Sequence, residues 1–126
     1  VELSCGLLKT KEKDYIFPVT EIVPKKEFFD FEAKYTEGMA DEIVPARVEE
    51  EIQERCKQIS SDIYDGIGCK GLVRMDFILR GNQIYFLELN TVPGMSKESI
   101  VPKMIRGDGY TEEEIIRTII EDGLNN

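Results

Sequence analysis

The stretch Gly71–Asn90, GLVRMDFILRGNQIYFLELN, decides the fold of this chain because it contains two apolar runs around a short polar segment. Apolar and β-branched residues on both sides of a Gly-Asn pair are typical of two antiparallel strands joined by a tight turn. We expect the strands at 72–79 and 84–89. Acidic side chains nevertheless interrupt both runs, Asp76 in the first strand and Glu88 in the second. Their position inside otherwise apolar strands needs a chemical reason.

Alternation of side chains along both strands predicts that the polar residues share one face. Residues two apart lie on the same face of a strand, so Arg74 lies beside Asp76, and Glu88 lies beside Asn90. We predict that Asp76 lies opposite Glu88 and that Arg74 lies opposite Asn90, with opposed Cβ atoms roughly 5 Å apart. The hairpin then carries a compact polar group on one face.

The register of the hairpin decides whether the two acids meet. If the loop consists of residues 81–83, residue 80 pairs with residue 84 and the acids lie opposite each other. The pair Gly81-Asn82 is also a two-residue turn signal, and that register puts the acids on opposite faces unless a β-bulge restores them. We therefore predict either the three-residue loop or a bulge.

The polar group of the hairpin is suited to a divalent cation. Two carboxylates this close repel each other, and in a poorly solvated site they need a cation to stay ionised. Oxygen ligands from Asp76, Glu88 and Asn90 suit Mg²⁺, which usually takes one or two carboxylates plus water and phosphate. Arg74 on the same face is then placed to contact a transferring phosphoryl group or a developing oxyanion. From periodicity alone, a solvated salt bridge between Arg74 and Asp76 on an exposed sheet face is the safer interpretation.

The composition indicates one globular domain with an acidic charge balance. The 126 residues are 41% hydrophobic and 33% charged, and the formal net charge is −9. This charge argues against a nucleic-acid or anionic-membrane partner, because such partners require a basic surface. The three cysteines have no CxxC spacing and histidine is absent, which argues against a disulfide framework and a Cys/His zinc site. No apolar run approaches the roughly 18 residues of a membrane span and no signal-peptide pattern opens the chain, so we expect a cytoplasmic protein.

The segments before the hairpin predict further strands. Residues 2–9 and 14–23 are rich in β-branched and aromatic residues and predict an antiparallel pair, with Pro18 at an edge or a bulge. Residues 25–45 show no sustained period and predict a short strand followed by a long loop. The sheet is therefore expected to be mostly antiparallel.

Two segments have the pattern of helices. Apolar residues recur at helical spacing at Val48, Ile52, Cys56, Ile59, Ile63 and Ile67. We expect this helix to end near Gly66 or Gly68. Near the C-terminus, Thr111 and Glu114 form a capping box before an apolar run, and Gly123 is a plausible stop. Helices that cover an antiparallel sheet define the class as α+β.

Four motifs in order, EAKY, GCKGLVRMDF, FLELNTVPGM and SIVP, resemble the C-terminal part of the D-alanine-D-alanine ligases. These ligases are ATP-grasp enzymes of bacterial peptidoglycan synthesis. The resemblance runs from about Glu2 to the final helix, so residues 1–126 are expected to be a fragment of the C-terminal ATP-grasp domain. The N-terminal domain and most of the central domain are absent by this interpretation, and we expect the fragment alone to be inactive.

The resemblance implies a reaction and a set of metal ligands. The family transfers the γ-phosphoryl group of ATP to the carboxylate of one D-alanine, and the amine of a second D-alanine attacks the acyl phosphate. By resemblance, Asp76, Glu88 and Asn90 bind two Mg²⁺ ions, with Mn²⁺ as an alternative, that bridge the phosphates of ATP. Arg74, Gly94 and Ser99 are the catalytic residues that the resemblance implies, and Arg74 stabilises the transferring phosphate and the tetrahedral intermediate.

The resemblance also implies contacts to both substrates. The expected ATP contacts are Glu2 at the ribose, Phe28 and Ile78 at the adenine, and Lys34 at the phosphates. The expected D-alanine contacts are Tyr35, Gly94, Ser99 and Ile100. Gly94 supplies a backbone N–H to the oxyanion, and Ser99 with the backbone of Ile100 holds the carboxylate of the second D-alanine. Judged singly, Lys34 and Tyr35 also fit a solvated loop, and Ser99 fits a helix N-cap.

Two other functions are compatible with the sequence. One is a different ATP-grasp carboxylate-amine ligase, although Tyr35 in the EAKY motif resembles the dipeptide-forming enzymes rather than the relatives that make the D-lactate ester. The other is a non-catalytic acidic module that binds a cation, but no EF-hand spacing supports Ca²⁺. The family usually forms homodimers, so we expect a homodimeric parent enzyme in the bacterial cytoplasm, with D-alanine and ATP as its ligands.

Overall fold

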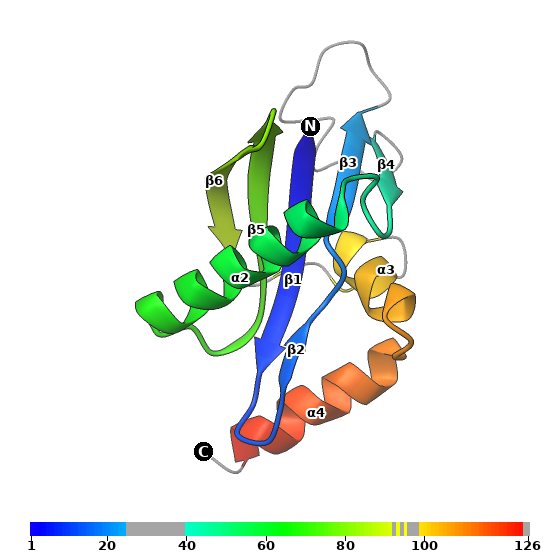
Figure 1. Ribbon diagram of the computed structural model, residues 1–126. Coiled ribbons are helices and arrows are strands. Elements are labelled where there is room, and N and C mark those ends of the chain that lie inside the picture. The colour runs from blue at the N-terminus through cyan, green and yellow to red at the C-terminus, as the bar shows by residue number, and fades with distance from the viewer. Residues whose placement is uncertain (25–39, 92, 94, 96–98, 125–126) are drawn as a thin grey trace.

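The computed structural model describes residues 1–24, 40–91, 93, 95 and 99–124, which form one antiparallel sheet with helices on both faces (Figure 1). The strands are β1 (Glu2–Lys9), β2 (Asp14–Ile16), β3 (Thr20–Pro24), β4 (Ala40–Ile43), β5 (Gly71–Arg80) and β6 (Gln83–Asn90), and the helices are α2 (Glu50–Ile67), α3 (Ile100–Gly107) and α4 (Glu112–Leu124). The strand order is β4-β3-β1-β5-β6, and β2 pairs with β1. The predicted α+β class is confirmed.

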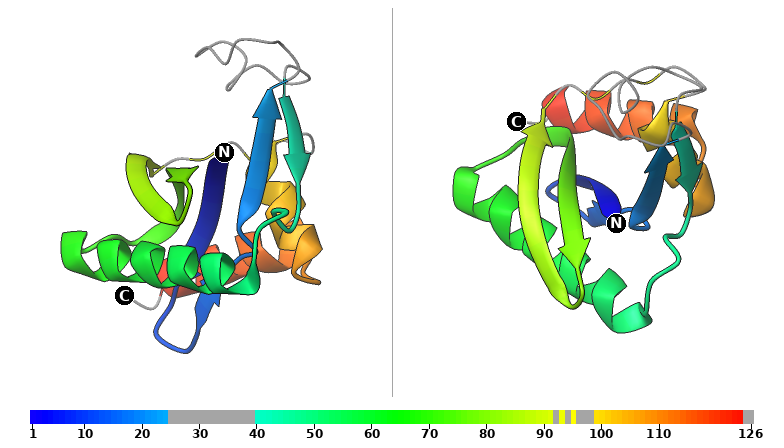
Figure 2. Two further views of the ribbon diagram at one scale, coloured as in Figure 1. Left: turned by 45° about the horizontal axis from the view of Figure 1, so that its top comes forward. Right: turned by 90° about the horizontal axis from the view of Figure 1, so that it is seen from above.

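The helices lie on opposite sides of the sheet, as Figure 2 shows with α2 on one side and α4 on the other. On the α2 side, Leu3, Cys5, Leu7, Val73, Met75 and Phe77 of the two central strands pack with Ile52, Cys56 and Tyr64 of the helix. On the other side, Leu8, Phe17, Ile22 and Leu72 pack with Ile100, Val101, Met104, Ile105 and Ile115 of α3 and α4. Each face of the sheet therefore has its own apolar core.

Both predicted helices are confirmed, but the stop expected at Gly123 is wrong, because α4 continues through it to Leu124. Helix α2 stops at Gly68, whose φ of 78° is the left-handed conformation that glycine adopts without strain. The capping box closes reciprocally, because the Glu114 N–H donates to Oγ1 of Thr111 at 3.1 Å and the Thr111 N–H donates to Oε1 of Glu114 at 3.2 Å. In the predicted apolar stripe Ile52 and Cys56 are buried, Val48, Ile59 and Ile63 are partly buried, and Ile67 in the last turn is 63% exposed.

The strands before α2 differ from the prediction in two places. Instead of one long partner, β1 pairs with both β2 and β3, which are separate because Pro18 interrupts the strand. Residues 40–43, predicted as part of a long loop, form β4 beside β3. The short strand expected at the start of 25–45 falls outside the described residues.

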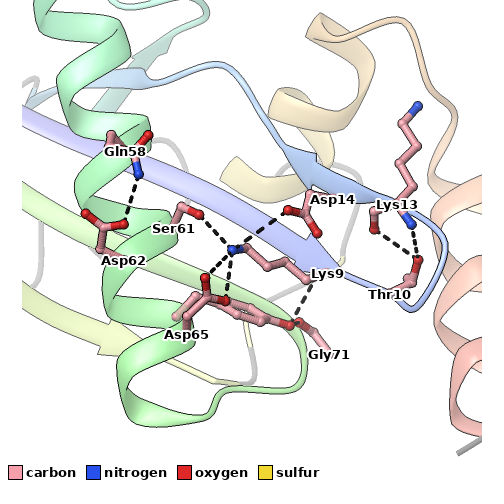
Figure 3. Close-up of polar contacts among 10 residues, drawn as sticks. Lys9, Thr10, Lys13, Asp14, Gln58, Ser61, Asp62, Asp65 and Gly71 are labelled. Atoms are coloured by element: carbon pink, nitrogen blue, oxygen red, sulfur yellow. Dashed lines mark hydrogen bonds and ion pairs between the residues drawn. The ribbon is translucent and has the colours of Figure 1, made fainter.

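A lysine at the end of β1 joins the sheet to α2 (Figure 3). Nζ of Lys9 donates to Oγ of Ser61 at 2.7 Å and to both carboxylate oxygens of Asp65 at 2.9 Å. The hydroxyl of Tyr64 accepts a hydrogen bond from the Lys9 N–H at 3.3 Å and donates one to the carbonyl of Gly71 at 2.6 Å. These bonds hold the end of α2 on the two central strands.

Among the described residues, no helix is long and apolar enough to cross a membrane.

Gly107 at the end of α3 is expected to tolerate no side chain. A Cβ built there lies 2.6 Å from Cγ1 of Val44, a short β-branched side chain with few rotamers to move into. We predict that Gly107→Ala lowers the free energy of unfolding by about 1–2 kcal/mol, because overpacking of about 1–3 kcal/mol outweighs the helix gain of about 0.5–1 kcal/mol. The difference in the free energy of unfolding is measured by urea unfolding. Gly123→Ala in α4 is the control, since its Cβ meets nothing within 4 Å; an equal effect of both variants would contradict the clash.

Candidate functional site

The hairpin of β5 and β6 reaches the predicted pairing through a bulge rather than through a longer loop. Arg80 pairs with Gln83, so the loop has two residues and the predicted three-residue loop is wrong. The φ of 58° at Gly81 is typical of a type II′ turn, which places glycine first. From this turn the pairs run in register to Phe77 and Phe86, and then Leu87 is skipped. A β-bulge of one residue therefore shifts the pairing of everything that follows.

Beyond the bulge, the polar residues meet as predicted. Asp76 pairs with Glu88, and Arg74 pairs with Asn90. The predicted bulge is confirmed, and its physical effect is to reverse the faces of the second half of β6. Without it, the two-residue turn would direct Glu88 away from Asp76, since neighbouring residues of a strand point to opposite faces.

Strand β1 extends this face on the other side of β5. Ser4 of β1 pairs with Asp76 on one side and with Thr20 of β3 on the other. Thr20, Ser4, Asp76 and Glu88 consequently stand in one line across four strands, which we call the polar row. Gly6 faces the same side, because a Cβ there would lie 3.1 Å from Sδ of Met104 in α3. The polar row therefore lies on the α3 side of the sheet.

Arg74 and Asp76 form a buried ion pair within this face. Nε of Arg74 donates to Oδ1 of Asp76 at 3.1 Å, and Nη2 donates to Oδ2 at 3.0 Å. Only 10% of the Arg74 side chain and 1% of the Asp76 side chain are exposed. The solvated salt bridge that periodicity alone favoured is therefore wrong. A buried pair is a poor source of stability because both charges lose their hydration, so its presence favours a chemical role.

The residues around Asp76 fit a hard divalent cation. Glu88 and Asn90 are half-buried, in contrast to Asp76. No group of three or more Asp, Glu or Cys side chains is close enough to hold a metal within the described ranges. The set of two carboxylates and one amide is nevertheless of the size that Mg²⁺ takes from proteins, since Mg²⁺ keeps waters and phosphate oxygens as its other ligands. Asp76, Glu88 and Asn90 could hold such an ion.

Two residues predicted to contact ATP form the cross-strand pair next to the polar row, on the same face of the sheet. Glu2 of β1 pairs with Ile78 of β5, and Glu2 is only 6% exposed. The acid and the apolar side chain are therefore neighbours of the polar row. Phe28, Lys34 and Tyr35, which were assigned to the nucleotide and to D-alanine, lie outside the described residues.

The predicted carboxylate-binding residues stand at the start of α3. Ser99 occupies the N-cap position with φ −75° and ψ 159°, and its side chain makes no capping hydrogen bond to the helix. Ile100 follows as the first helical residue and is buried. Gly94 lies outside the described residues. The helix α3 itself was not predicted beyond its start, because eight residues with an internal proline carry little periodicity.

Ser4 is a site residue that sequence reasoning missed. Its Oγ donates to Oδ1 of Asp76 at 2.7 Å, and both residues are 0% exposed. The available signal was a small polar residue in the middle of an apolar strand, two positions from Glu2 and hence on the same face. That signal becomes specific only when the partner strand is known.

The thiols on the opposite face are expected to be unreactive. Burial raises the pKa of the Cys5 thiol to about 11, and burial also raises the pKa of Cys56. At pH 8 only about 0.1% of a thiol with that pKa is ionised, so we predict alkylation of Cys5 about 10²–10³-fold slower than that of an ordinary thiol. The half-buried Cys69 should react first.

A timed pulse of iodoacetamide followed by mass spectrometry of the peptides measures this order of reaction. The rate at Cys5 should rise with pH up to about 11, because only the thiolate reacts. Cys69→Ser should remove the early-labelled peptide and leave the rate at Cys5 unchanged. Labelling of Cys5 as fast as Cys69 in the native protein would contradict the burial.

Comparison with known proteins gives consistent matches over almost the whole chain. A family model described as "D-ala D-ala ligase C-terminus" matches residues 1–121. The chain is 47% identical over 122 residues to a D-alanine--D-alanine ligase of Bacteroides fragilis, a match that covers 96% of this chain and 37% of that protein. The chain therefore spans little more than a third of the length of such curated relatives.

Solved structures agree with the sequence matches. D-alanyl-alanine synthetase A from Vibrio cholerae superposes with a TM-score of 0.82 at 28% identity, covering 99% of this chain and 39% of that one. The VanG D-Ala:D-Ser ligase from Enterococcus faecalis has a TM-score of 0.80 at 30% identity, with 95% and 35% covered. The D-alanine--D-alanine ligase from Bacillus anthracis complexed with ATP has a TM-score of 0.75 at 29% identity, with 98% and 39% covered.

Proposed function

Because this chain belongs to the D-alanine-D-alanine ligase C-terminus family, we propose that it forms the metal- and phosphate-binding part of an ATP-dependent ligase that joins two molecules of D-alanine. The observation that carries the proposal is the buried Arg74–Asp76 pair, which the bulge in β6 sets opposite Asn90 and Glu88. Such a pair has little value for stability alone, and it stands where a phosphate-bridging cation would need oxygen ligands.

In this proposal Asp76, Glu88 and Asn90 hold Mg²⁺, whose charge, when bound, neutralises the phosphate oxygens of ATP. Two such ions are proposed, and Mn²⁺ can replace them. Arg74, in the line next to the carboxylates, stabilises the negative charge that develops during phosphoryl transfer and on the tetrahedral intermediate. Glu2 holds the ribose, Ile78 and Phe28 contact the adenine, and Lys34 contacts the phosphates.

The second D-alanine is proposed to bind at the start of α3. Its carboxylate is held by Ser99 and by the backbone N–H of Ile100, because the first N–H groups of a helix have no partner within the helix and attract anions. Gly94 donates a backbone N–H to the oxyanion, and Tyr35 closes the site. Positioning and charge neutralisation then account for most of the rate enhancement.

The wider assignments rest on membership of the family. We place residues 1–126 in the C-terminal ATP-grasp domain of a longer, homodimeric enzyme of the bacterial cytoplasm, acting in peptidoglycan synthesis and so in cell-wall biogenesis and cell shape. The lysines and adenine-binding segments of the rest of the enzyme are needed for turnover, so the chain alone is expected to be inactive.

The test is phosphate release by the full-length protein. With ATP and Mg²⁺, adding D-alanine should start release of phosphate and formation of the dipeptide, measured by a coupled phosphate assay and by mass spectrometry of the product. No release on adding D-alanine would contradict the proposal. D-serine and D-lactate should be tested in the same assay, because one structural relative is named a D-Ala:D-Ser ligase. Preference for D-serine or D-lactate as second substrate would assign a different ligase.

A further inference from the structure

Among the described residues, Asp76 accepts hydrogen bonds from donors of two different kinds, Arg74 and Ser4. Arg74 comes from the same strand and carries a charge, whereas Ser4 comes from the neighbouring strand and is neutral. Oδ1 of Asp76 accepts from both, with Ser4 at 2.7 Å and Nε of Arg74 at 3.1 Å. The shorter of these two bonds is therefore the one to the serine.

The two donors differ in how firmly they are placed. Ser4 has a one-carbon side chain on the central strand β1, and its backbone is paired to both β3 and β5. Its hydroxyl is placed by a single side-chain torsion on a backbone that pairs with two neighbouring strands. The guanidinium of Arg74 donates two hydrogen bonds to Asp76, but it stands at the end of a long side chain with many rotamers, so holding it in place costs more conformational entropy.

The two donors also differ in what they do when substrate binds. In the proposed function, Arg74 also stabilises the transferring phosphoryl group, so its hydrogen-bond donors are shared between phosphate and Asp76. Ser4 has no charge to offer a phosphate and stays on Oδ1. A neutral donor also leaves the negative charge of Asp76 available to a cation, whereas a guanidinium competes for it.

We propose that Ser4 is a positioning residue for the metal ligand Asp76. It fixes the side chain of Asp76 toward Glu88, so that the two carboxylates bind a divalent cation together while Arg74 is engaged by phosphate. The inference rests on the proposed function and adds to it a residue outside the set of ligands. Partners of this kind are worth about 10–100-fold in metal affinity.

The test is Mn²⁺ binding to the full-length enzyme, followed by electron paramagnetic resonance with a non-hydrolysable ATP analogue present. Ser4→Ala should raise the dissociation constant of Mn²⁺ about tenfold. Ser4→Thr keeps the hydroxyl and should restore affinity close to that of the unmodified enzyme. Ser4→Cys keeps a donor at the same position, slightly larger and weaker than the hydroxyl, and should lie between the two, so the test remains usable if the alanine variant folds poorly.

Ser60→Ala is the matched control. Ser60 is also a 0% exposed serine, but its Oγ donates to the carbonyl of Cys56 at 2.8 Å within α2, on the other side of the sheet. The Ser60→Ala variant should lower the melting temperature, as Ser4→Ala does, and should leave Mn²⁺ binding unchanged. A purely structural role of Ser4 predicts that the two alanine variants behave alike in both measurements.

Asp76→Asn separates failure of this inference from failure of the proposed function. Loss of Mn²⁺ binding in Asp76→Asn together with unchanged binding in Ser4→Ala overturns the positioning role alone. Unchanged binding in both variants overturns the metal site, and with it the proposed function. Weaker binding in both, with rescue by Ser4→Thr, supports both assignments.

Discussion

Replacing Asp76 by Asn and Glu88 by Gln together is expected to lower D-alanine-dependent phosphate release by about 10²–10³-fold in the full-length enzyme. The amides nearly keep the shape of the carboxylates but lack their charge, so a divalent cation and the phosphates it neutralises lose their main electrostatic partner. The release rate is measured at saturating ATP over a range of Mg²⁺ concentrations. Nucleotide binding in the presence of Mg²⁺ should weaken in parallel.

The control for this variant removes two carboxylates elsewhere. Asp62→Asn with Glu113→Gln changes the net charge equally, and both residues lie on helices, where Asp62 accepts from Gln58 and Glu113 pairs with Arg117 on the surface. Rates are compared per folded enzyme, because Asp76→Asn also leaves the buried charge of Arg74 without its counter-ion. Metal and nucleotide binding that is equal in the two double variants would show that the acids of the hairpin hold no cation.

Replacing Arg74 by Met is expected to destabilise the protein by about 3–5 kcal/mol. The change leaves the carboxylate of Asp76 with 1% exposure and without the two hydrogen bonds that Arg74 donates. The hydrogen bond from Ser4 remains, but a buried charge that loses its counter-ion still bears much of the cost of its lost hydration. Urea unfolding followed by circular dichroism measures the free energy.

The double variant Arg74→Met with Asp76→Leu separates stability from function. Apolar side chains of similar size often replace a buried pair with little loss, so the double variant should recover most of the stability lost by Arg74→Met. Phosphate release should stay low in both variants, because the residues proposed to bind the cation and the phosphoryl group are gone. Exposed pairs are worth only about 0–1 kcal/mol, so a loss of that size for Arg74→Met would contradict the burial of this one.

Local patterns were sufficient for the helices α2 and α4 and for the two faces of β5. The apolar stripe from Val48 to Ile63 and the capping box at Thr111 depend on neighbours within a few residues, so periodicity and capping chemistry predict them well. The same holds for Arg74 and Asp76, which share a face because they are two apart in one strand. The order of four motifs then identified the family, which no single residue could do.

The sequence by itself determined which side chains are available to the site, and the tertiary structure decided which of them meet. The bulge at Leu87 sets Glu88 opposite Asp76, and its position depends on the balance of turn geometry and cross-strand packing along the whole hairpin. Because β1 lies between β3 and β5 in the sheet, Ser4 contacts Asp76, although the two residues are 72 positions apart in the sequence. Burial of the Arg74–Asp76 pair likewise comes from strands and helices far away in the chain. The alternation of residues along a strand predicts which side chains share a face. The pairing register, the neighbouring strands and the burial of a residue are properties of the assembled sheet.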